Sequence, residues 1–451
     1  MNPHPSMEAN TILLCETSFD YGLTPFRFFH SWFTIEGFDS FVESTWNSFN
    51  IVEENGLIRL KKKLKLLKIA IKAWMKDARM KSNEKKSIIL KKLADLDRLI
   101  ASELAQKAKI HWSIEGDENS KFFHGVINKK RSQLAIWGIL VDGNWISEPT
   151  AVKNEFFKHF QKQFSPPQSS SFRFDFVFPT RISSDQVDTL ECDVSYDEIK
   201  AAVWDCGTDK TPGPDGFPFE FFRRYWSFIN QDVLMAVKAF FLDGQFPRGC
   251  NSSFTALIPK IQEAKLVKDF RPISLIGSVY KNITKILANR LCLVLPCLIS
   301  DVQSAFVSSR QILDGPFILN ELISWCKHKK FKGMIFKVDF EKAFDSVKWE
   351  FLEETLKSFG FGHRWCKWIS GCLNNARGSV LVNGNPTSEF QFFKGLKQGD
   401  PLSPFLFILI METLHLSFKR ILSAGLYKGI SITRSFMILH LFYTDDVIFV
   451  G

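Results

Sequence analysis

Two adjacent carboxylates between two apolar runs are the feature that most constrains the fold of this chain. Asp445 and Asp446 follow the apolar residues of 438–442 and precede the apolar run 447–450. Short apolar runs separated by two turn-forming residues predict a β-hairpin with a tight turn. Aspartate is frequent in turns for conformational reasons, so the pair could be a plain hairpin turn. Adjacent carboxylates also suit hard divalent cations, which prefer oxygen ligands.

A third carboxylate stands at the end of another predicted strand, upstream of this hairpin. The apolar residues of 335–338 predict a buried strand that ends at Asp339, after which the apolar spacing becomes helical. On a strand beside the hairpin, Asp339 would join the two hairpin carboxylates in one cleft. Three such carboxylates can hold two Mg²⁺ ions about 4 Å apart, which activate an attacking hydroxyl and stabilise the leaving phosphate oxygens.

A loop followed by an apolar helix is predicted between these two segments. The loop, residues 395–402, contains glycine and proline, and the residues after it are strongly apolar. Ser403 is predicted as the N-cap and Pro404 as the first helical residue, because these residue types favour those positions. A loop that runs into a helix N-terminus suits contacts with phosphates or bases.

In their order, these segments resemble the conserved motifs of one enzyme family. V-D-F-E-K-A-F, Q-G-D-P-L-S-P and Y-T-D-D are similar to motifs A, B and C of reverse transcriptases, and the residues around them resemble the LINE-type (non-LTR) retrotransposon polymerases of plants. The resemblance implies an RNA-directed DNA polymerase that uses an RNA template, a DNA primer and deoxynucleoside triphosphates. It also implies an α+β fold, with fingers and a partial palm built on an antiparallel sheet backed by helices, preceded by a basic helical region.

The resemblance gives each matching residue an expected role. The three carboxylates match the catalytic triad that binds Mg²⁺ or Mn²⁺. Phe344 matches the aromatic side chain that excludes a ribose 2′-hydroxyl, although it could be an ordinary core phenylalanine. Gln398 and Gly399 match the motif B pair near the incoming nucleotide and the template. Asp345 is interpreted as a structural or surface carboxylate, and Thr444, where the family usually has alanine, as a residue that suits a strand end.

Two cations upstream are candidates for binding the triphosphate. A buried strand is predicted over 255–260, ending in Lys260, and Arg271 follows on the same expected fingers hairpin. Arginine would bind phosphate as a planar fork and lysine as a point charge, although either side chain could simply be solvated. The segment 303–310 resembles a family segment that lies along the template, which makes Arg310 a candidate contact to the nucleic-acid backbone.

The positive charge of the chain is concentrated in one predicted helical region. The net charge is +10, and 14 basic residues against two acidic ones lie between Arg59 and Lys92. Apolar residues at helical spacing predict long helices within 36–130. Such a run can be a solvated helix face, but it also suits phosphate binding that weakens with salt. The candidate nucleic-acid contacts are Lys61, Lys62, Lys65 and Lys68.

Four regions are predicted along the chain. Residues 1–35 resemble the C-terminal end of the endonuclease that precedes these polymerases, without its Ser-Asp-His triplet; 36–164 form the basic helical region with a small hairpin; 165–189 are a linker; and 190–451 are fingers and partial palm. The chain ends shortly after the carboxylate pair, before the family's thumb and primer grip. We therefore expect a polymerase that is weak or inactive as this fragment, and the alternative is a catalytically dead nucleic-acid-binding remnant.

The cysteine pattern and the hydropathy of the chain indicate where in the cell the protein is expected. The nine cysteines form no C-x-x-C motif, and no apolar run reaches the roughly 18–20 residues of a membrane span. We expect a reducing, intracellular location, nucleus or cytoplasm, without a membrane partner. A group II intron maturase would share the three motifs, but the segment H-W-S-I-E-G-D-E-N-S-K-F-F-H resembles the LINE-type branch. The sequence leaves the oligomeric state open.

Overall fold

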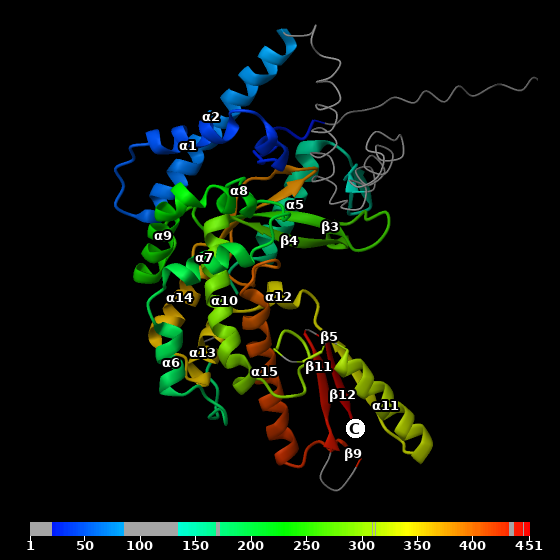
Figure 1. Ribbon diagram of the computed structural model, residues 1–451. Coiled ribbons are helices and arrows are strands. Elements are labelled where there is room, and N and C mark those ends of the chain that lie inside the picture. The colour runs from blue at the N-terminus through cyan, green and yellow to red at the C-terminus, as the bar shows by residue number, and fades with distance from the viewer. Residues whose placement is uncertain are drawn as a thin grey trace, which may run out of the picture.

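The computed structural model combines helices with two main sheets. It describes residues 20–84, 134–167, 172–308, 310–311, 313–432, 437–444 and 446–451. Figure 1 shows most helices gathered on the left, the two sheets one above the other on the right, and one helix, in yellow, beyond the lower sheet. Of the helices within these ranges, none has both the length and the hydropathy that a membrane span requires. The mixed helix-and-sheet architecture agrees with the predicted α+β class.

The element boundaries follow the order of the chain. The helices are η1 (His30–Thr34), α1 (Phe38–Ser48), α2 (Gly56–Glu84), α5 (Pro149–Gln163), α6 (Ser184–Glu191), α7 (Tyr196–Asp205), α8 (Phe219–Arg224), α9 (Trp226–Asp243), η2 (Val267–Asp269), α10 (Ser278–Leu298), α11 (Asp314–Lys329), α12 (Ala343–Ser346), α13 (Trp349–Phe359), α14 (His363–Leu373) and α15 (Ser403–Ser423). The strands are β1 (Ile139–Val141), β2 (Asn144–Ile146), β3 (Ser252–Pro259), β4 (Phe270–Ile276), β5 (Ile335–Asp339), β6 (Arg377–Val382), β7 (Asn385–Pro386), β8 (Phe390–Gln391), β9 (Ile430–Ser431), β10 (Met437–Ile438), β11 (His440–Tyr443) and β12 (Asp446–Val450).

The larger sheet joins segments that lie far apart in the sequence. Its strand order is β4-β3-β6-β7, with β8 also paired to β6. β3 and β4 are antiparallel, whereas β3 and β6 are parallel. α5 packs on this sheet, and its buried apolar stripe of Val152, Phe156 and Phe160 forms a core with Val380 and Phe390. We call β3, β4, β6, β7 and β8 the five-stranded sheet.

The smaller sheet carries the predicted carboxylates. Its order is β11-β12-β5, and both pairings are antiparallel. β11 and β12 form the hairpin that the two apolar runs predict. β5 forms one edge of this sheet, and Ile335 and Phe336 are 46% and 57% exposed. The predicted strand over 335–338 is therefore present, but the prediction that it is buried is wrong. We call β5, β11 and β12 the aspartate sheet.

The helices form the main hydrophobic core. α10 and α15 are long and strongly apolar, and they contact each other. The apolar spacing of 278–298 predicts one long helix, and α10 occupies that span. α15 begins at Ser403, but its N-cap is Leu402, and no side-chain cap hydrogen bond forms. The prediction of Ser403 as the N-cap is therefore wrong by one residue, because the chain enters the helical conformation before the serine.

The basic helix α2 is anchored to this core by its apolar side. Leu60, Leu64, Leu67 and Ile71 are at most 4% exposed, as their helical spacing predicts. The helix packs along α9. The residues after Glu84, up to 133, lie outside the described part, and with them the rest of the predicted helical region. The predicted lysines at 61, 62, 65 and 68 thus belong to a helix whose apolar face packs against the core.

Two segments outside the long helices also contribute to the core. In the upstream segment Phe28 is 1% exposed, and its backbone N–H donates to the carbonyl of Gly216 at 2.9 Å. Within the predicted linker, Phe178 is 2% exposed and meets the Phe359 ring edge to face, and α6 begins at Ser184. Both segments pack against residues of the predicted polymerase region. The domain boundaries predicted at 35, 164 and 189 stay predictions.

Candidate active site

The antiparallel register places two predicted carboxylates directly opposite each other. Asp446, the first residue of β12, pairs with Asp339, the last residue of β5. Directly opposed side chains in an antiparallel pair point to the same face, with Cβ atoms about 4.5–5.5 Å apart. The backbone hydrogen bonding between β5 and β12 thus brings together residues that are far apart in the sequence. Asp445 lies outside the described residues.

The turn that carries the carboxylate pair is held by a buried glutamine. β11 ends at Tyr443 and Thr444 has a φ of +55°, the left-handed region that β-branched residues rarely adopt. The Thr444 N–H donates to the side-chain oxygen of Gln303 at 3.2 Å, and the same oxygen accepts from the Ala305 N–H. Gln303 is 2% exposed and bridges to Phe442. The expectation that Thr444 suits a strand end is wrong, because it is a turn residue.

A lysine accompanies the two carboxylates. The Nζ of Lys337, on β5, lies 3.1 Å from Oδ1 of Asp446. The two side chains are 58% and 31% exposed, so the pair is open to solvent. This contact is not among the predictions, although the two-residue period of a strand places Lys337 on the face of Asp339. The face of the aspartate sheet therefore carries two carboxylates and one ammonium among its described residues.

The donor set fits a hard divalent cation. Asp339 and Asp446 offer carboxylate oxygens from opposed positions, and oxygen is the ligand type that Mg²⁺ prefers. Within the described ranges, no cluster of three His, Cys, Asp or Glu side chains could hold a metal ion. The predicted trio includes Asp445, so the described residues test only two of its members.

Behind the hairpin lies a buried polar cluster. His440 of β11 and His415 of α15 are 1% and 3% exposed, and their ring nitrogens Nε2 and Nδ1 lie 2.6 Å apart. Burial lowers the pKa of His415 to about 3 and that of His440 to about 4. Burial raises the pKa of nearby Glu412 to about 7. The aspartate sheet is thus fastened to α15 through neutral imidazoles.

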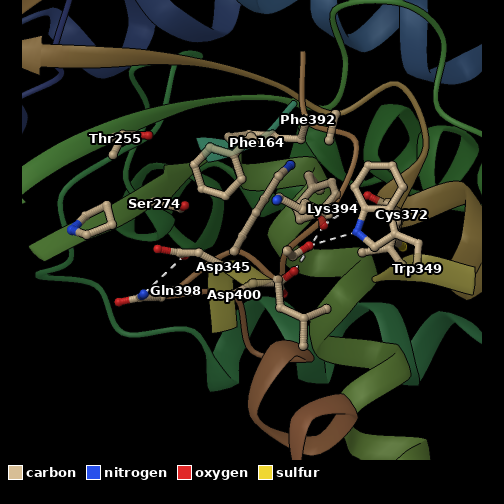
Figure 2. Close-up of a pocket in the computed structure, with 17 residues that line it drawn as sticks. Phe164, Thr255, Ser274, Asp345, Trp349, Cys372, Phe392, Lys394, Gln398 and Asp400 are labelled. Atoms are coloured by element: carbon tan, nitrogen blue, oxygen red, sulfur yellow. Dashed lines mark hydrogen bonds between the residues drawn. The ribbon is translucent and has the colours of Figure 1, made fainter. Parts of the chain in front are cut away.

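The loop after the five-stranded sheet holds a second group of predicted site residues. Figure 2 shows Gln398 and Asp345 pointing toward each other. The Asp345 carboxylate accepts hydrogen bonds from the side chain of Gln398 at 3.2 Å and from that of Gln163 at 2.7 Å. Asp345 is 4% exposed, and burial raises its pKa to about 6. The interpretation of Asp345 as structural agrees with its burial, whereas a surface position does not.

The same loop lies against the strand that carries Arg271. The Ser274 N–H of β4 donates to the carbonyl of Gln398 at 2.7 Å. Gly399 has a φ of +102°, and a Cβ at this position would lie 3.0 Å from the Ser274 carbonyl. Only glycine therefore suits this close approach. Arg271 is an exposed residue of β4 opposite Ile258, and Lys260 follows β3. The Lys260 ammonium donates to the Lys268 carbonyl at 3.1 Å and lies near enough to Asp345 to lower its pKa slightly.

A partly buried lysine, Lys397, holds the base of this loop. Lys397 donates to the Asn251 carbonyl at 3.2 Å, and its ammonium lies 4.1 Å from the ring centre of Tyr280. Burial lowers the pKa of Lys397 to about 8, and it raises that of the neighbouring Asp400. Asp400 accepts from the Tyr280 hydroxyl at 3.0 Å. This group is not among the predictions, because in the sequence its charged residues resemble ordinary loop residues.

The remaining predicted residues occupy less specific environments. Phe344 is half-buried and stacks on Phe407 of α15 with ring centres 4.4 Å apart, as an ordinary core phenylalanine would. Arg310 donates to the carbonyls of Ile299, Ser300 and Gln303 at 2.6–2.9 Å, and is only 17% exposed. Its guanidinium thus holds the loop after α10, and its contact with nucleic acid stays a prediction.

The four predicted lysines of α2 divide into two sets. Lys62 forms an ion pair with Glu53 at 2.6 Å. Lys61, Lys65 and Lys68 line a common cavity together with the segment around Pro214 and the start of α10. Burial lowers the pKa of Lys68, whose ammonium donates to the Pro214 carbonyl at 3.3 Å. The structure therefore brings three of the four lysines to one site.

The predicted residues form two groups on separate sheets. Asp339 and Asp446 belong to the aspartate sheet, and Gln398, Gly399 and Arg271 lie on or against the five-stranded sheet. In the part of the chain that the structure describes, no hydrogen bond or ion pair joins the two groups directly. The short segment from Asp339 to α12 connects them through the chain.

Comparisons with known proteins bear on the predicted family. Residues 258–451 match the family model described as reverse transcriptase (RNA-dependent DNA polymerase). The chain is 28% identical over 338 residues to the uncharacterised 149 kDa protein of transposon TX1 from Xenopus laevis, which covers 74% of this chain and 26% of that protein. It is 29% identical over 240 residues to the retrovirus-related Pol polyprotein of the type-2 retrotransposable element R2DM from Drosophila melanogaster, covering 51% and 22%. A shorter match, 42% identical over 67 residues, is to an uncharacterised mitochondrial protein of Arabidopsis thaliana, covering 15% and 55%.

Residues 258–451, less than half of the chain, therefore resemble reverse transcriptases. The relatives are proteins of a transposon and of retrotransposable elements, which supports the prediction of a LINE-type reverse transcriptase. The chain spans 26% and 22% of the length of the first two relatives. The assignment to plants is supported only by the short Arabidopsis match and stays a prediction.

Proposed function

We propose that this chain catalyses RNA-templated DNA synthesis, with the aspartate sheet as the palm and the five-stranded sheet as part of the fingers. The observation that carries the proposal is the register of β5 and β12, which opposes Asp339 to Asp446. These residues, with Asp445, would hold Mg²⁺ or Mn²⁺. The bound cation would offset the negative charge that develops on the phosphate oxygens.

The substrate residues have distinct roles in this proposal. Arg271 and Lys260 would bind the triphosphate of the incoming deoxynucleotide from the five-stranded sheet, since an arginine fork and a lysine point charge both bind phosphate. Gln398, held by Asp345 and by the Ser274 N–H, would orient the nucleotide beside the template. Phe344 would exclude a ribose 2′-hydroxyl.

The reaction is an in-line displacement at phosphorus. The primer 3′-oxygen forms a bond to the α-phosphorus of the nucleotide, and the bond from that phosphorus to the bridging oxygen of the β-phosphate breaks. Pyrophosphate leaves, and the proton of the 3′-hydroxyl passes to solvent. Catalysis of phosphoryl transfer is mainly positioning and electrostatic stabilisation, which rigid strand ends can supply.

The template is proposed to extend along α2. Lys61, Lys65 and Lys68 face one cavity between α2 and the start of α10, and among the described residues Asp215 is the one acidic residue that lines it. A groove with three ammonium groups suits the phosphates of a nucleic-acid strand, whose affinity should fall steeply with salt. Arg310 is proposed only as a weaker contact, because its donors are engaged within the protein.

Primer extension tests the proposal directly. The full chain is incubated with a poly(rA)/oligo(dT) duplex, dTTP and Mg²⁺, beside Asp339→Asn and the Asp445→Ala/Asp446→Ala double variant. Extension should fall to background in both variants. Asp188→Asn, an exposed aspartate of α6, removes the same charge elsewhere and should leave extension unchanged.

Two outcomes would count against polymerase activity. Extension that survives in both variants would mean that the carboxylates are not catalytic. No extension by the wild-type chain, with RNA binding that weakens as salt is raised, would favour the alternative of a nucleic-acid-binding protein. In that case, Lys61→Glu with Lys65→Glu should abolish the binding if α2 is the contact.

A further inference from the structure

Lys337 lies beside the proposed cation site of the aspartate sheet. Lys337 pairs with Ile448 in the register, two positions along from the opposed Asp339 and Asp446. Because alternate residues of a strand point to one face, Lys337 lies on the face of the two carboxylates. Its Nζ is 3.1 Å from Oδ1 of Asp446, at ion-pair distance.

We propose that Lys337 competes with divalent cations for Asp446 and so sets the cation affinity of this site. The inference rests on the proposed function, since it concerns the same carboxylates. A carboxylate oxygen can accept a hydrogen bond from an ammonium or serve as a ligand to a metal ion. A cation held by Asp446 would repel the Lys337 ammonium, and Lys337 would have to move away for the cation to bind.

The geometry suits a displaceable competitor. The Lys337 side chain is 58% exposed, and its flexible stem can turn into solvent without a change in the backbone. Solvent-exposed ion pairs are weak, so a divalent ion can displace this one. Before a cation binds, the ammonium stabilises the site, because its positive charge offsets the repulsion between the two opposed carboxylates.

Direct Mn²⁺ binding tests the inference without relying on catalysis. The full wild-type chain and the Lys337→Met variant are titrated with Mn²⁺, and free Mn²⁺ is measured by electron paramagnetic resonance. Methionine keeps the length and the apolar stem but removes the charge. Removing a unit positive charge a few ångströms from the ion should lower the dissociation constant about three- to tenfold. Lys337→Arg, which keeps the charge, should bind Mn²⁺ like the wild type.

A matched control separates local competition from net charge. Lys357 also forms an ion pair, at 2.6 Å with Glu353, but on the exposed surface of α13. Lys357→Met removes the same charge and a comparable pair, and should leave the Mn²⁺ dissociation constant unchanged. Asp446→Asn should weaken binding and abolish the gain from Lys337→Met. Circular dichroism of each variant checks that the chain is folded.

Each result decides between the inference and the proposed function. Equal Mn²⁺ affinity in the wild type and Lys337→Met, with binding lost in Asp446→Asn, would overturn the competition and leave the cation site standing. Tighter binding in Lys357→Met as well would overturn it in favour of a general charge effect. No Mn²⁺ bound by either the wild type or Lys337→Met would overturn both the inference and the proposed cation site.

Discussion

Strand β6 of the five-stranded sheet and strand β5 of the aspartate sheet differ in how far they are buried, and the candidate catalytic residue Asp339 lies on the less buried strand. In β6 of the five-stranded sheet, five of the six residues are buried. In β5 of the aspartate sheet, four of the five residues are exposed. Strands with equally apolar sequences thus have opposite environments. Burial supports a rigid scaffold, whereas an exposed strand end leaves carboxylates accessible to ions and to a polyanionic substrate.

Charged groups near the two candidate sites also differ in exposure. On the five-stranded side, Asp345 and Asp400 are buried and accept hydrogen bonds from Gln163 and Tyr280, and the partly buried Lys397 lies beside Asp400. On the aspartate sheet, Lys337 and Asp446 face solvent. The first arrangement fixes the geometry of a loop at a desolvation cost that hydrogen bonds offset. The second keeps charges that a ligand can exchange, at little cost to stability.

The largest expected effect compares two phenylalanines on strands. Phe390 of β8 is 2% exposed, and Phe336 of β5 is 57% exposed. Phe390→Ala should lower the free energy of unfolding by about 3–5 kcal/mol, because it leaves a cavity in a packed core. Phe336→Ala should change it by about 0.5 kcal/mol or less. Urea denaturation followed by circular dichroism measures both. Equal losses would mean that the exposed face of β5 is covered in solution.

The comparison also separates what the sequence could predict from what it could not. The hairpin β11–β12 follows from two apolar runs around turn residues, and α10 follows from helical spacing over a long segment. Both signals are local. The exposure of β5 depends on its place at the edge of a sheet, which is decided by strand pairing across more than a hundred residues of chain.

In the candidate site, too, local sequence patterns predict some features and miss those that depend on long-range contacts. The opposition of Asp339 and Asp446 could be expected, because both stand at strand ends and the family resemblance orders the strands. The burial of Asp345 could not, since a carboxylate on a one-turn helix has no periodic signal to say which side it faces. The role of Gln303 could not be predicted either, because its hydrogen bond to the hairpin turn joins segments that no sequence pattern relates.

The second prediction concerns the histidines that fasten the aspartate sheet to α15. In the unfolded chain, histidine titrates near pH 6.5, whereas burial lowers the pKa of His415 to about 3 and that of His440 to about 4. Below pH 6.5 the unfolded state therefore binds more protons, and stability is lost as the pH falls toward 4. Lys419 also disfavours protonation of both rings.

The ionisation of Glu412 changes the free energy of unfolding with pH in the opposite direction and partly cancels the effect of the histidines. Burial raises the pKa of Glu412 to about 7, so that ionisation destabilises the fold as the pH rises from about 4.5. Glu412→Gln removes this contribution and should lose roughly 2–4 kcal/mol of unfolding free energy between pH 7 and pH 5. The wild type should lose less. His363→Gln, at an exposed position, serves as the control. A flat profile for Glu412→Gln would show that the histidine pair accepts protons freely in the folded state.

A smaller effect is expected from the buried carboxylate beside the five-stranded sheet. Asp345→Asn keeps one acceptor oxygen but turns an amide toward one of the two glutamine donors. Leaving a buried donor unpaired should cost about 1–3 kcal/mol. Amide hydrogen exchange of residues 395–400 should become faster, because Gln398 loses its anchor. Asp188→Asn is again the matched control. Unchanged exchange would mean that the Ser274 contact alone positions the loop.

The smallest effect concerns the backbone of the hairpin turn. Two-residue hairpin turns of the favoured type need positive φ at both central positions, which asparagine tolerates better than β-branched residues do. Thr444 has a φ of +55°, so Thr444→Asn should stabilise the chain by about 1 kcal/mol. The β1–β2 turn offers the reciprocal control, because Asp142 has a φ of +49° at an exposed position. Asp142→Thr should destabilise by a similar amount in the same urea titration. Asp142→Thr could lower the free energy of unfolding while Thr444→Asn leaves it unchanged. That result would indicate that the Gln303 hydrogen bond already compensates the backbone strain at Thr444. The turn of the aspartate sheet would then be held more tightly than the exposed edge strand β5 suggests.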